Sequence, residues 1–316
     1  MNITKKDKTI LIGPTGFMGP SFLEKDSSII AVGRSKLPSH LDNEFFYIES
    51  DESFSELDKL DFQNVIFLIG CSDHHILNQH PTLAIEKNVL ALSRFLWYLK
   101  KSKRKVNKII NFTTMLQYDT QKMKLPCDEL QPRNPSINNY ILSKYVSELI
   151  TEQHRDDYDI IDIRISNVYG PTKLMRPDIV PSTIWSLIHN NSASVWTKKP
   201  KRDFIYVDDV IEAVLKLIQT DFSGSVNLGT GVGSTVGELC GYLEKFSNIK
   251  ISNQNKDVSG HMEFYQDITL LKSLIDWKPK YSLERGLFKT YNLMKDYYKE
   301  KEVKNRIQME FNKLKR

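Results

Sequence analysis

The sequence predicts an α/β protein with a doubly wound parallel sheet and a smaller C-terminal α/β lobe. Short, almost wholly apolar runs alternate with amphipathic stretches in the first half of the chain. This pattern is typical of strands that are buried on both faces and joined by helical crossovers. A glycine-rich turn follows the first apolar run and opens a short helix. After about Gly170 the loops lengthen and the apolar runs become isolated, which indicates a second unit.

Six apolar runs in the first half are predicted strands, and three stretches between them are predicted helices. The strands cover residues 9–12, 29–32, 45–48, 65–69, 109–112 and 160–165. The helices cover residues 19–25, 81–100 and 137–152. Because crossovers between parallel strands are right-handed, elements in this order are expected to form a doubly wound sheet.

The second half of the chain has fewer strands and longer connections. Its predicted strands are residues 204–207 and 225–228. Its predicted helices are residues 179–190, 207–219, 236–246 and 283–298. We therefore expect a first domain over residues 1–170, to which some later segments return. A smaller lobe over residues 171–294 and a basic helical tail over residues 295–316 are expected to follow.

Composition excludes several classes of protein. The 316 residues are 40% hydrophobic and 26% charged, which is close to the globular average and excludes disorder over most of the chain. The 3 cysteines are far apart, so neither a disulfide scaffold nor a cysteine-rich zinc module fits, and no metal site is expected. No apolar run approaches the ~18 residues of a membrane span. The N-terminus also lacks the apolar segment of a signal peptide, so we expect a cytoplasmic protein without a membrane partner.

The net charge of +5 comes from three basic segments on an otherwise acidic chain. These segments are residues 100–105, 198–202 and 295–316. No zinc-finger, helix-turn-helix or RRM signature accompanies them, so no nucleic-acid partner is expected. The segment that ends at Arg202 is instead suited to an anionic small molecule.

The turn after the first strand has the spacing of a dinucleotide-binding turn. It reads GPTGFMG and opens a helix. Glycines allow the backbone to approach a pyrophosphate closely, and the helix N-terminus offers free N–H groups. This placement predicts a Rossmann-type cofactor site, whereas a glycine turn without a ligand is the alternative. The expected contacts are Gly13, Thr15, Gly16, Phe17, Met18 and Gly19.

The end of the second strand favours NADP(H) over NAD(H). An acidic residue that binds the ribose 2′-hydroxyl is expected there, but the sequence reads AVGRS and places Arg34 at this point. A guanidinium suits a 2′-phosphate. In the alternative, Arg34 stacks on the adenine or faces solvent, and either cofactor is used.

A phenol and an ammonium lie one helical turn apart at Tyr140 and Lys144. A phenol with a pKa near ~10 is a poor base at neutral pH, but a nearby cation favours its ionised form. The hydroxyls of Thr113 and Thr114 follow a predicted strand, at the sheet edge where ligands of α/β proteins bind. One of them is positioned to donate to a substrate oxygen beside Tyr140, and ordinary turn chemistry is the alternative.

With these motifs in order, the chain resembles the extended short-chain dehydrogenase/reductase family, in its nucleotide-sugar epimerase/reductase/dehydratase branch. The resemblance covers about residues 9–287. The matching segments are residues 13–19, 113–118, 129–135, 140–144, 164–171, 202–209, 227–229 and 276–279.

The resemblance implies an NAD(P)-dependent enzyme that transfers a hydride at a carbon of a nucleoside-diphosphate sugar. Tyr140 would act as the general acid/base on the sugar oxygen, and Thr114 would hydrogen-bond that oxygen. Lys144 would lower the pKa of Tyr140 and orient the cofactor. Asn167 and Arg202 would hold the substrate diphosphate.

Other positions and a partner follow from the same resemblance. Ile69 and Gly70, at the end of the fourth strand, and Asn88, on the next helix, match positions near the cofactor. A homodimer is implied, in which helices 81–100 and 137–152 pair with their copies.

The chain departs from the family pattern at two places. Met115 and Leu116 follow Thr114 where many 4,6-dehydratases carry an Asp-Glu pair, so a dehydratase is disfavoured. The fourth strand leads into His74 and His75, for which we favour exposed loop positions over a role in the site.

Two classes of function are compatible with these residues. The first is a 4-epimerase or a 4-keto reductase, which use the same Tyr, Lys and Thr; Arg34 favours the reductase. The second is a catalytically silent NAD(P)-binding regulatory protein on the same fold. The intact Tyr140, Lys144 and Thr114 argue against this second class.

Overall fold

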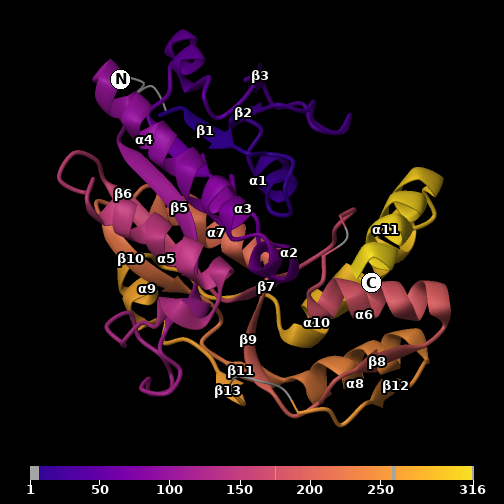
Figure 1. Ribbon diagram of the computed structural model, residues 1–316. Coiled ribbons are helices and arrows are strands. Elements are labelled where there is room, and N and C mark those ends of the chain that lie inside the picture. The colour runs from indigo at the N-terminus through magenta and orange to yellow at the C-terminus, as the bar shows by residue number, and fades with distance from the viewer. Residues whose placement is uncertain (1–6, 175, 258–260, 315–316) are drawn as a thin grey trace.

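A parallel sheet forms the centre of the computed structural model, which describes residues 7–174, 176–257 and 261–314 (Figure 1). Within these residues its seven strands are ordered β10-β6-β5-β4-β1-β2-β3, and each neighbouring pair is parallel. The strands are β1 (Thr9–Ile12), β2 (Ile30–Gly33), β3 (Phe45–Tyr47), β4 (Asn64–Phe67), β5 (Lys108–Thr114), β6 (Ile160–Ile165) and β10 (Gly224–Leu228). The predicted doubly wound α/β fold is confirmed.

The strand order places a binding crevice at the carboxyl ends of β1 and β4. The chain runs outward from β1 through β2 to β3, and then returns to place β4 on the other side of β1. Connections that leave two neighbouring strands in opposite directions open a crevice outside the carboxyl ends of those strands. The residues that follow β1, β4 and β5 therefore converge at one edge of the sheet.

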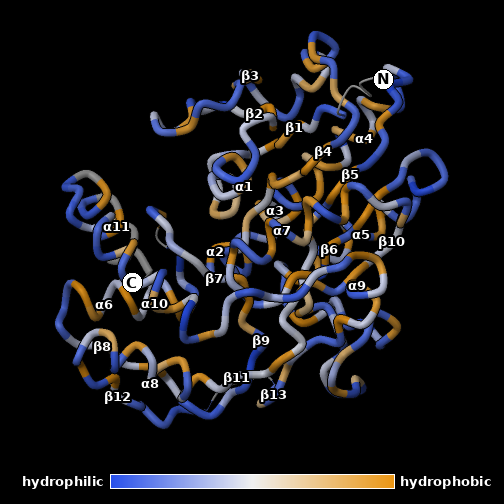
Figure 2. The backbone as a smooth tube through the Cα atoms, turned by 180° about the vertical axis from the view of Figure 1, so that it is seen from behind, coloured by the Kyte–Doolittle hydropathy of each residue, from blue (hydrophilic) through white to orange (hydrophobic). Residues whose placement is uncertain are grey.

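Helices cover both faces of the sheet. On one face, α1 (Gly19–Lys25) and α7 (Val207–Leu217) pack on alternate strand residues such as Leu11 and Ile66. On the other face, α4 (Ala91–Ser102) packs on residues such as Ile10 and Val65. Strand side chains alternate between faces, so both sides of each central strand are apolar and buried. Figure 2 shows these strands as hydrophobic segments inside hydrophilic loops.

The predicted helix over residues 81–100 is divided into three parts. It consists of α3 (Pro81–Ile85), a π-helical turn over Glu86–Leu90, and α4. The next predicted helix begins two residues later than expected, as α5 (Asn139–Glu152). The Asn138 side chain accepts a hydrogen bond from the backbone N–H of Ile141 (2.9 Å) and so caps this helix.

A smaller group of elements lies below the carboxyl edge of the sheet in Figure 1. In it, β9 (Lys201–Tyr206) pairs with β7 (Asn167–Tyr169), β11 (Gly233–Thr235) and β13 (Glu263–Phe264), while β12 (Ile251–Asn253) pairs with β8 (Ala193–Val195). The helices beside them are α6 (Ile179–Asn190), α8 (Val236–Ser247), α10 (Leu283–Tyr297) and α11 (Lys301–Leu314).

Two later segments return to the central sheet. β10, predicted as an isolated strand of the second half, pairs with β6 and extends the sheet, and α7 covers one face. The fold also contains two short helices, α2 (His74–Gln79) and α9 (Thr269–Leu274). In the basic tail, Val303 and Ile307 of α11 are buried in the core, whereas residues 315–316 lie outside the described residues.

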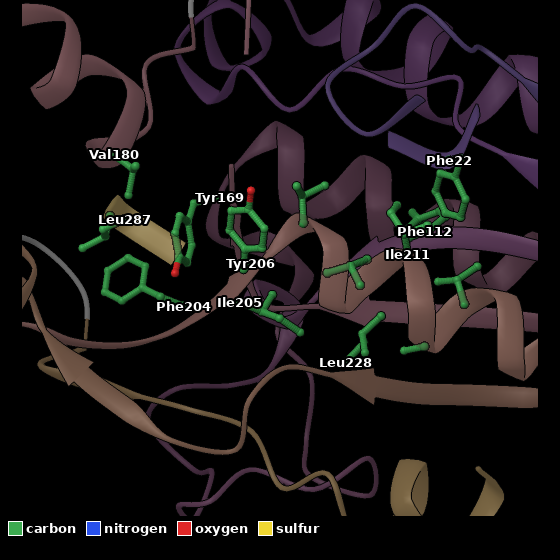
Figure 3. Packing of buried hydrophobic residues seen from close by; sticks show 14 of the residues in the cluster. Phe22, Phe112, Tyr169, Val180, Phe204, Ile205, Tyr206, Ile211, Leu228 and Leu287 are labelled. Carbon is green, nitrogen blue, oxygen red and sulfur yellow. The ribbon is translucent and has the colours of Figure 1, made fainter. Parts of the chain in front are cut away.

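One hydrophobic cluster joins the sheet to the smaller group of elements. Figure 3 shows Phe22 and Phe112 on the sheet side of this cluster and Tyr169, Phe204 and Leu287 on the other side. Because this core is continuous, the two parts share their packing, and the crevice between them has a fixed shape. Among the described residues, no helix combines the length and the apolar character that crossing a membrane requires.

Candidate active site

A cavity of about 280 Å³ opens at the carboxyl ends of β1, β4 and β5. Segments from both parts of the chain form its walls. Its polar and charged lining residues include Cys71, Ser72, His74, Thr113, Thr114, Tyr140, Lys144, Ser166, Asn167, Arg176 and Asp178. The cavity therefore brings together the predicted hydroxyl, phenol and ammonium groups.

The glycine turn forms one wall of this cavity through Gly16, Phe17 and Met18. Gly13 has a φ of +87°, and its N–H donates to the carbonyl of Val32 (3.0 Å), so the turn is tied to the end of β2. The positive φ favours glycine here. A Cβ placed on Gly16 would have its nearest neighbour at 3.9 Å, so the backbone at this point is open to a ligand.

Tyr140 is buried on α5, and its phenol is close enough to the Thr114 side chain for that hydroxyl to influence its pKa. The Thr114 hydroxyl accepts from the backbone N–H of Leu116 (3.2 Å), which holds it at the end of β5. Burial raises the pKa of the Tyr140 phenol to about 12, and the Thr114 side chain opposes this shift. In the free protein, Tyr140 is therefore protonated at neutral pH.

Lys144 lies one turn further along α5, and its Nζ donates to the carbonyl of Phe112 (2.8 Å). Burial lowers the pKa of this ammonium to about 8. The strongest influences on the pKa of Tyr140 are burial, Thr114, Asp178, Arg176 and Cys71. Here the ammonium is directed at a backbone carbonyl, so the lowering of the Tyr140 pKa by Lys144 stays a prediction.

The ammonium of Lys144, which is partly shielded from solvent, is expected to reduce the stability of the fold. Lys144→Met is expected to raise the free energy of unfolding at pH 7 by on the order of 2–3 kcal/mol, because burying the charge disfavours the folded state. The folded-state pKa of about 8 lies below the ordinary value of 10.5, so the cost is complete below pH 8 and disappears toward pH 10.5. Denaturant unfolding of wild type and variant between pH 7 and pH 10 checks this.

The matched control for that experiment is Lys101→Met on the exposed side of α4. Its unfolding free energy should differ from wild type by less than ~0.5 kcal/mol at every pH. If Lys144→Met were instead destabilising at pH 7, the bond to Phe112 would outweigh the cost of burial.

Ser166 offers a free hydrogen-bonding group to a ligand. Its Oγ is buried in the cavity wall and has no hydrogen-bond partner among the described residues. Buried hydroxyls are nearly always paired, so this atom indicates a polar group that arrives with a ligand. Together with the open backbone at Gly16, it is compatible with a dinucleotide bound at this cavity.

Asn88 shapes the site without lining the cavity. Its Oδ1 accepts from the N–H of Cys71 (2.7 Å), and its Nδ2 donates to the carbonyl of Cys71 (3.1 Å) and to the Oγ of Ser143 (2.9 Å). A Cβ on Gly70 would lie 3.0 Å from Asn88 Oδ1, so the close approach favours glycine. The predicted cofactor residue Asn88 therefore uses its hydrogen-bonding groups to hold the end of β4 against α5.

Of the remaining predicted residues, some line the cavity and others lie outside it. Ile69 and Gly70 line the cavity, and so does Asn167, whose Nδ2 donates to the carbonyl of Asp203 (3.1 Å). Arg34 is exposed beyond β2. Arg202 lies on β9 outside the cavity lining; its Nη1 donates to the carbonyl of Lys201 (2.9 Å), and burial lowers its pKa.

Several charged or titratable residues in the cavity wall were not predicted, among them His74, Arg176 and Asp178. The ring of His74 lies against the ring of Tyr140, with centroids 4.1 Å apart, whereas His75 is exposed. The expectation of an exposed loop is therefore wrong for His74. Arg176 binds Asp178 (2.7 Å). Asp73 is a typical N-cap residue, and it is a sequence signal for a helix that begins at His74. The long loop around Arg176 carries no comparable signal.

Comparison with known proteins identifies the chain. Its sequence matches the model of the NAD dependent epimerase/dehydratase family over residues 10–229. The chain belongs to this family. The predicted recognition of the NAD-dependent epimerase/dehydratase family is confirmed.

Curated relatives of this family member carry several activities in their names. A dTDP-D-glucose 4,6-dehydratase of Bos taurus is 28% identical over 177 residues, which cover 52% of this chain and 49% of the relative. A CDP-abequose synthase of Salmonella muenchen is 28% identical over 168 residues, which cover 50% of this chain and 56% of the relative. The chain thus spans about half the length of these relatives.

Solved structures share the fold of this epimerase/dehydratase family member over nearly its whole length. A UDP-glucose 4-epimerase of Thermotoga maritima, solved with UDP-glucose, superposes with a TM-score of 0.83 at 22% identity. The superposition covers 92% of this chain and 99% of that chain. A UDP-glucuronic acid 4-epimerase of Bacillus cereus, solved with NAD, gives a TM-score of 0.79 at 21% identity and covers 92% of this chain and 100% of that chain.

Proposed function

We propose that this protein transfers a hydride at a carbon of a nucleoside-diphosphate sugar, as a 4-keto reductase or a 4-epimerase. The observation that carries the proposal is the buried pair of Tyr140 and Thr114, which both line the cavity bordered by the glycine turn. A phenol and a hydroxyl in this arrangement can hold one sugar oxygen between them and move its proton.

In the proposed mechanism the protein binds the sugar oxygen and controls its proton. The nicotinamide cofactor supplies or accepts the hydride when bound. Thr114 donates to the reacting oxygen, and Tyr140 gives it a proton on reduction or takes one on oxidation. The protonated state of Tyr140 in the free protein is the form that reduction requires. Lys144 would turn from Phe112 toward the cofactor ribose and the phenol, where its charge would make Tyr140 more acidic.

The cofactor is proposed to be NADP(H), with NAD(H) as the alternative. The family is NAD-dependent, and the B. cereus epimerase was solved with NAD. The support for NADP(H) is Arg34, which is exposed just beyond β2. A guanidinium in this position can bind a 2′-phosphate through two hydrogen bonds.

The substrate diphosphate is proposed to bind between Asn167 and Arg202. Asn167 lines the cavity, and Arg202 follows Lys198, Lys199 and Lys201 on the approach to β9. Lys198 is paired with Glu244 (3.0 Å), so it contributes less to the local potential than its charge suggests. The Thermotoga relative was solved with UDP-glucose, which supports a sugar nucleotide as the ligand class.

Dehydration remains the less favoured reaction in this proposal, although a curated relative is a 4,6-dehydratase. Elimination of water from a sugar needs an acid and a base besides the phenol. Met115 and Leu116, which follow Thr114, lie in the cavity wall and have no such group.

The deciding experiment records the bound cofactor of the purified protein and assays a panel of nucleotide sugars and their 4-keto derivatives. Bound oxidised cofactor with sugar isomerisation would identify an epimerase. Consumption of added NADPH by a 4-keto sugar would identify a reductase. Cofactor binding without turnover of any sugar would contradict the proposal and favour the silent regulatory protein.

We also propose a homodimer through the outer faces of α4 and α5. Leu90, at the start of α4, Trp97, on α4, and Leu142, on α5, are exposed apolar side chains on these helices. Covering such a surface with a second copy is favourable. Light scattering should give a mass twice the 36.7 kDa of one chain, and Trp97→Glu should return the protein to one chain. A monomeric wild type would contradict this prediction.

A further inference from the structure

His74 contacts Tyr140 through the faces of their rings. The ring centroids lie 4.1 Å apart, and the planes are inclined by 33°. Both residues line the cavity. Stacked rings attract each other and exclude water from the shared face. His74 therefore constrains the ring of the phenol, while Thr114 lies beside it in the cavity lining.

Hydrogen bonds within α2, and between α2 and α5, set the position of His74. Asp73 Oδ1 accepts from the N–H groups of His75 (3.0 Å) and Ile76 (3.1 Å), so α2 begins at His74. The side chain of Asn139, on α5, donates to the carbonyl of Leu77 on α2 (3.2 Å).

Further contacts tie α2 to α5. The side chain of Asn139 also donates to the carbonyl of Asn78 (3.2 Å), and its backbone N–H donates to Asn78 Oδ1 (3.2 Å). Leu77 packs with Tyr140 and Ile141 in one buried cluster. These bonds and contacts fix the two rings relative to each other before any ligand binds.

Titratable groups from three segments surround His74. Burial lowers the pKa of the imidazole, while Asp178, before α6, and Asp73, at the start of α2, oppose that shift. Tyr140 faces the ring from α5, and it is uncharged in the free protein. Near neutral pH His74 is therefore an uncharged flat ring, which suits packing against a phenol.

We propose that His74 is a positioning residue, which packs against the ring of Tyr140 and keeps the phenol hydroxyl directed at Thr114 and the reacting oxygen. This inference rests on the proposed function, in which Tyr140 moves a proton. Reacting groups must be held close to their productive geometry, and a displacement of ~1 Å can cost ~10²-fold in rate. The packed ring of His74 supplies that restraint at the face of the phenol.

The test compares a variant that lacks a ring at position 74 with a variant that keeps a ring there. His74→Ala is expected to lower kcat by about 10–100-fold, with a change in KM below about threefold. His74→Phe keeps a flat ring in the same place and should stay within about threefold of wild-type kcat. The matched control is His75→Ala, which removes the exposed neighbour and should leave kcat unchanged.

Two outcomes would overturn the proposal. An unchanged kcat in His74→Ala would show that the phenol needs no packing partner. An equal loss in His74→Phe and His74→Ala would show that the imidazole nitrogen, and not the ring, is required. Circular dichroism and thermal unfolding of each variant separate these results from a failure to fold.

A second measurement does not depend on catalysis. In protein labelled with ¹³C at the tyrosine ζ carbon, the resonance of Tyr140 is assigned by its loss in Tyr140→Phe. It should shift with pH as His74 ionises below pH 6.5, and this step should disappear in His74→Phe and persist in His75→Ala. A missing step in wild type would refute the stacked contact, whereas an inactive wild type with the step present would contradict only the proposed function.

Discussion

Tyr140→Phe is expected to lower kcat by about 10²–10⁴-fold, because it removes the phenol oxygen that lies with Thr114 and Lys144 in the cavity lining and is proposed to move the proton. The phenylalanine ring keeps the buried packing with His74, Leu77 and Ile141, so the fold should be retained. Steady-state rates of the preferred sugar and single-turnover hydride transfer would both report the loss. Substrate affinity should change far less than kcat.

Tyr145→Phe is the matched control for this prediction. Tyr145 lies on the same helix, and its ring contacts the guanidinium of Arg133 with the charge 4.6 Å from the ring centroid. This substitution also removes one phenol hydroxyl, but Tyr145 lies away from the cavity lining. If Tyr140→Phe kept full activity, proton transfer by this phenol would be wrong.

The pKa of Tyr140 bears on the direction of the reaction. Burial raises it to about 12, so the free protein holds the proton that a keto sugar needs on reduction. Oxidation of a sugar hydroxyl requires the opposite state and therefore a cation close to the phenol. In this structure the ammonium of Lys144 is bonded to Phe112 instead. A reductase is consistent with this arrangement as it stands, whereas an epimerase requires Lys144 to move when cofactor binds.

The fold and the reacting groups could be predicted because local sequence determines them. Apolar runs of strand length specify a buried parallel sheet, and the glycine turn needs the backbone freedom found at Gly13. Tyr140 and Lys144 share one helix, so their spacing alone places them together. The return of β10 to the sheet depends on pairing with β6 across a long stretch of chain, and no local pattern reports that contact.

The parts of the site that escaped prediction depend on contacts between distant segments. His74 meets Tyr140 only because α2 is tied to α5 by Asn139. The side chain of Arg176 lies 4.0 Å from the ring centroid of Phe17, which belongs to a segment far earlier in the chain. The contact between Asn88 and Cys71 likewise joins two separate segments through a π-helical turn, and the position of Asn88 beside the cofactor stays a prediction.

A buried ion pair behind the site predicts the largest loss of stability. The carboxylate of Glu148, on α5, accepts from Arg164 (2.6 Å), Arg133 (3.0 Å), Gln117 (2.6 Å) and Ser225 (2.7 Å). Glu148→Met should lower the free energy of unfolding by about 3–5 kcal/mol, because the buried Arg164 guanidinium cannot lose its proton and would keep an uncompensated charge. Denaturant unfolding at pH 7 measures this loss.

The control for Glu148→Met lies one turn away on the same helix. Glu152 approaches Arg133 at 3.6 Å but is partly exposed, so Glu152→Met should cost less than ~1 kcal/mol. The double variant Glu148→Met with Arg164→Met removes both buried charges. It should be more stable than the sum of the two single losses predicts. Additive losses would show that the two charges do not stabilise each other.

The pH dependence of this loss has a defined sign. Burial alone would raise the pKa of Glu148, but the hydrogen bonds and charge of Arg164 hold it below its ordinary value of 4.5. The carboxylate therefore stabilises the fold above pH 4.5, and this stabilisation is lost as the pH falls through the folded-state pKa. The difference between wild type and Glu148→Met should thus be largest near neutral pH and shrink in acid. A difference that grew as the pH fell would mean that the carboxylate is not held in its charged form by Arg164.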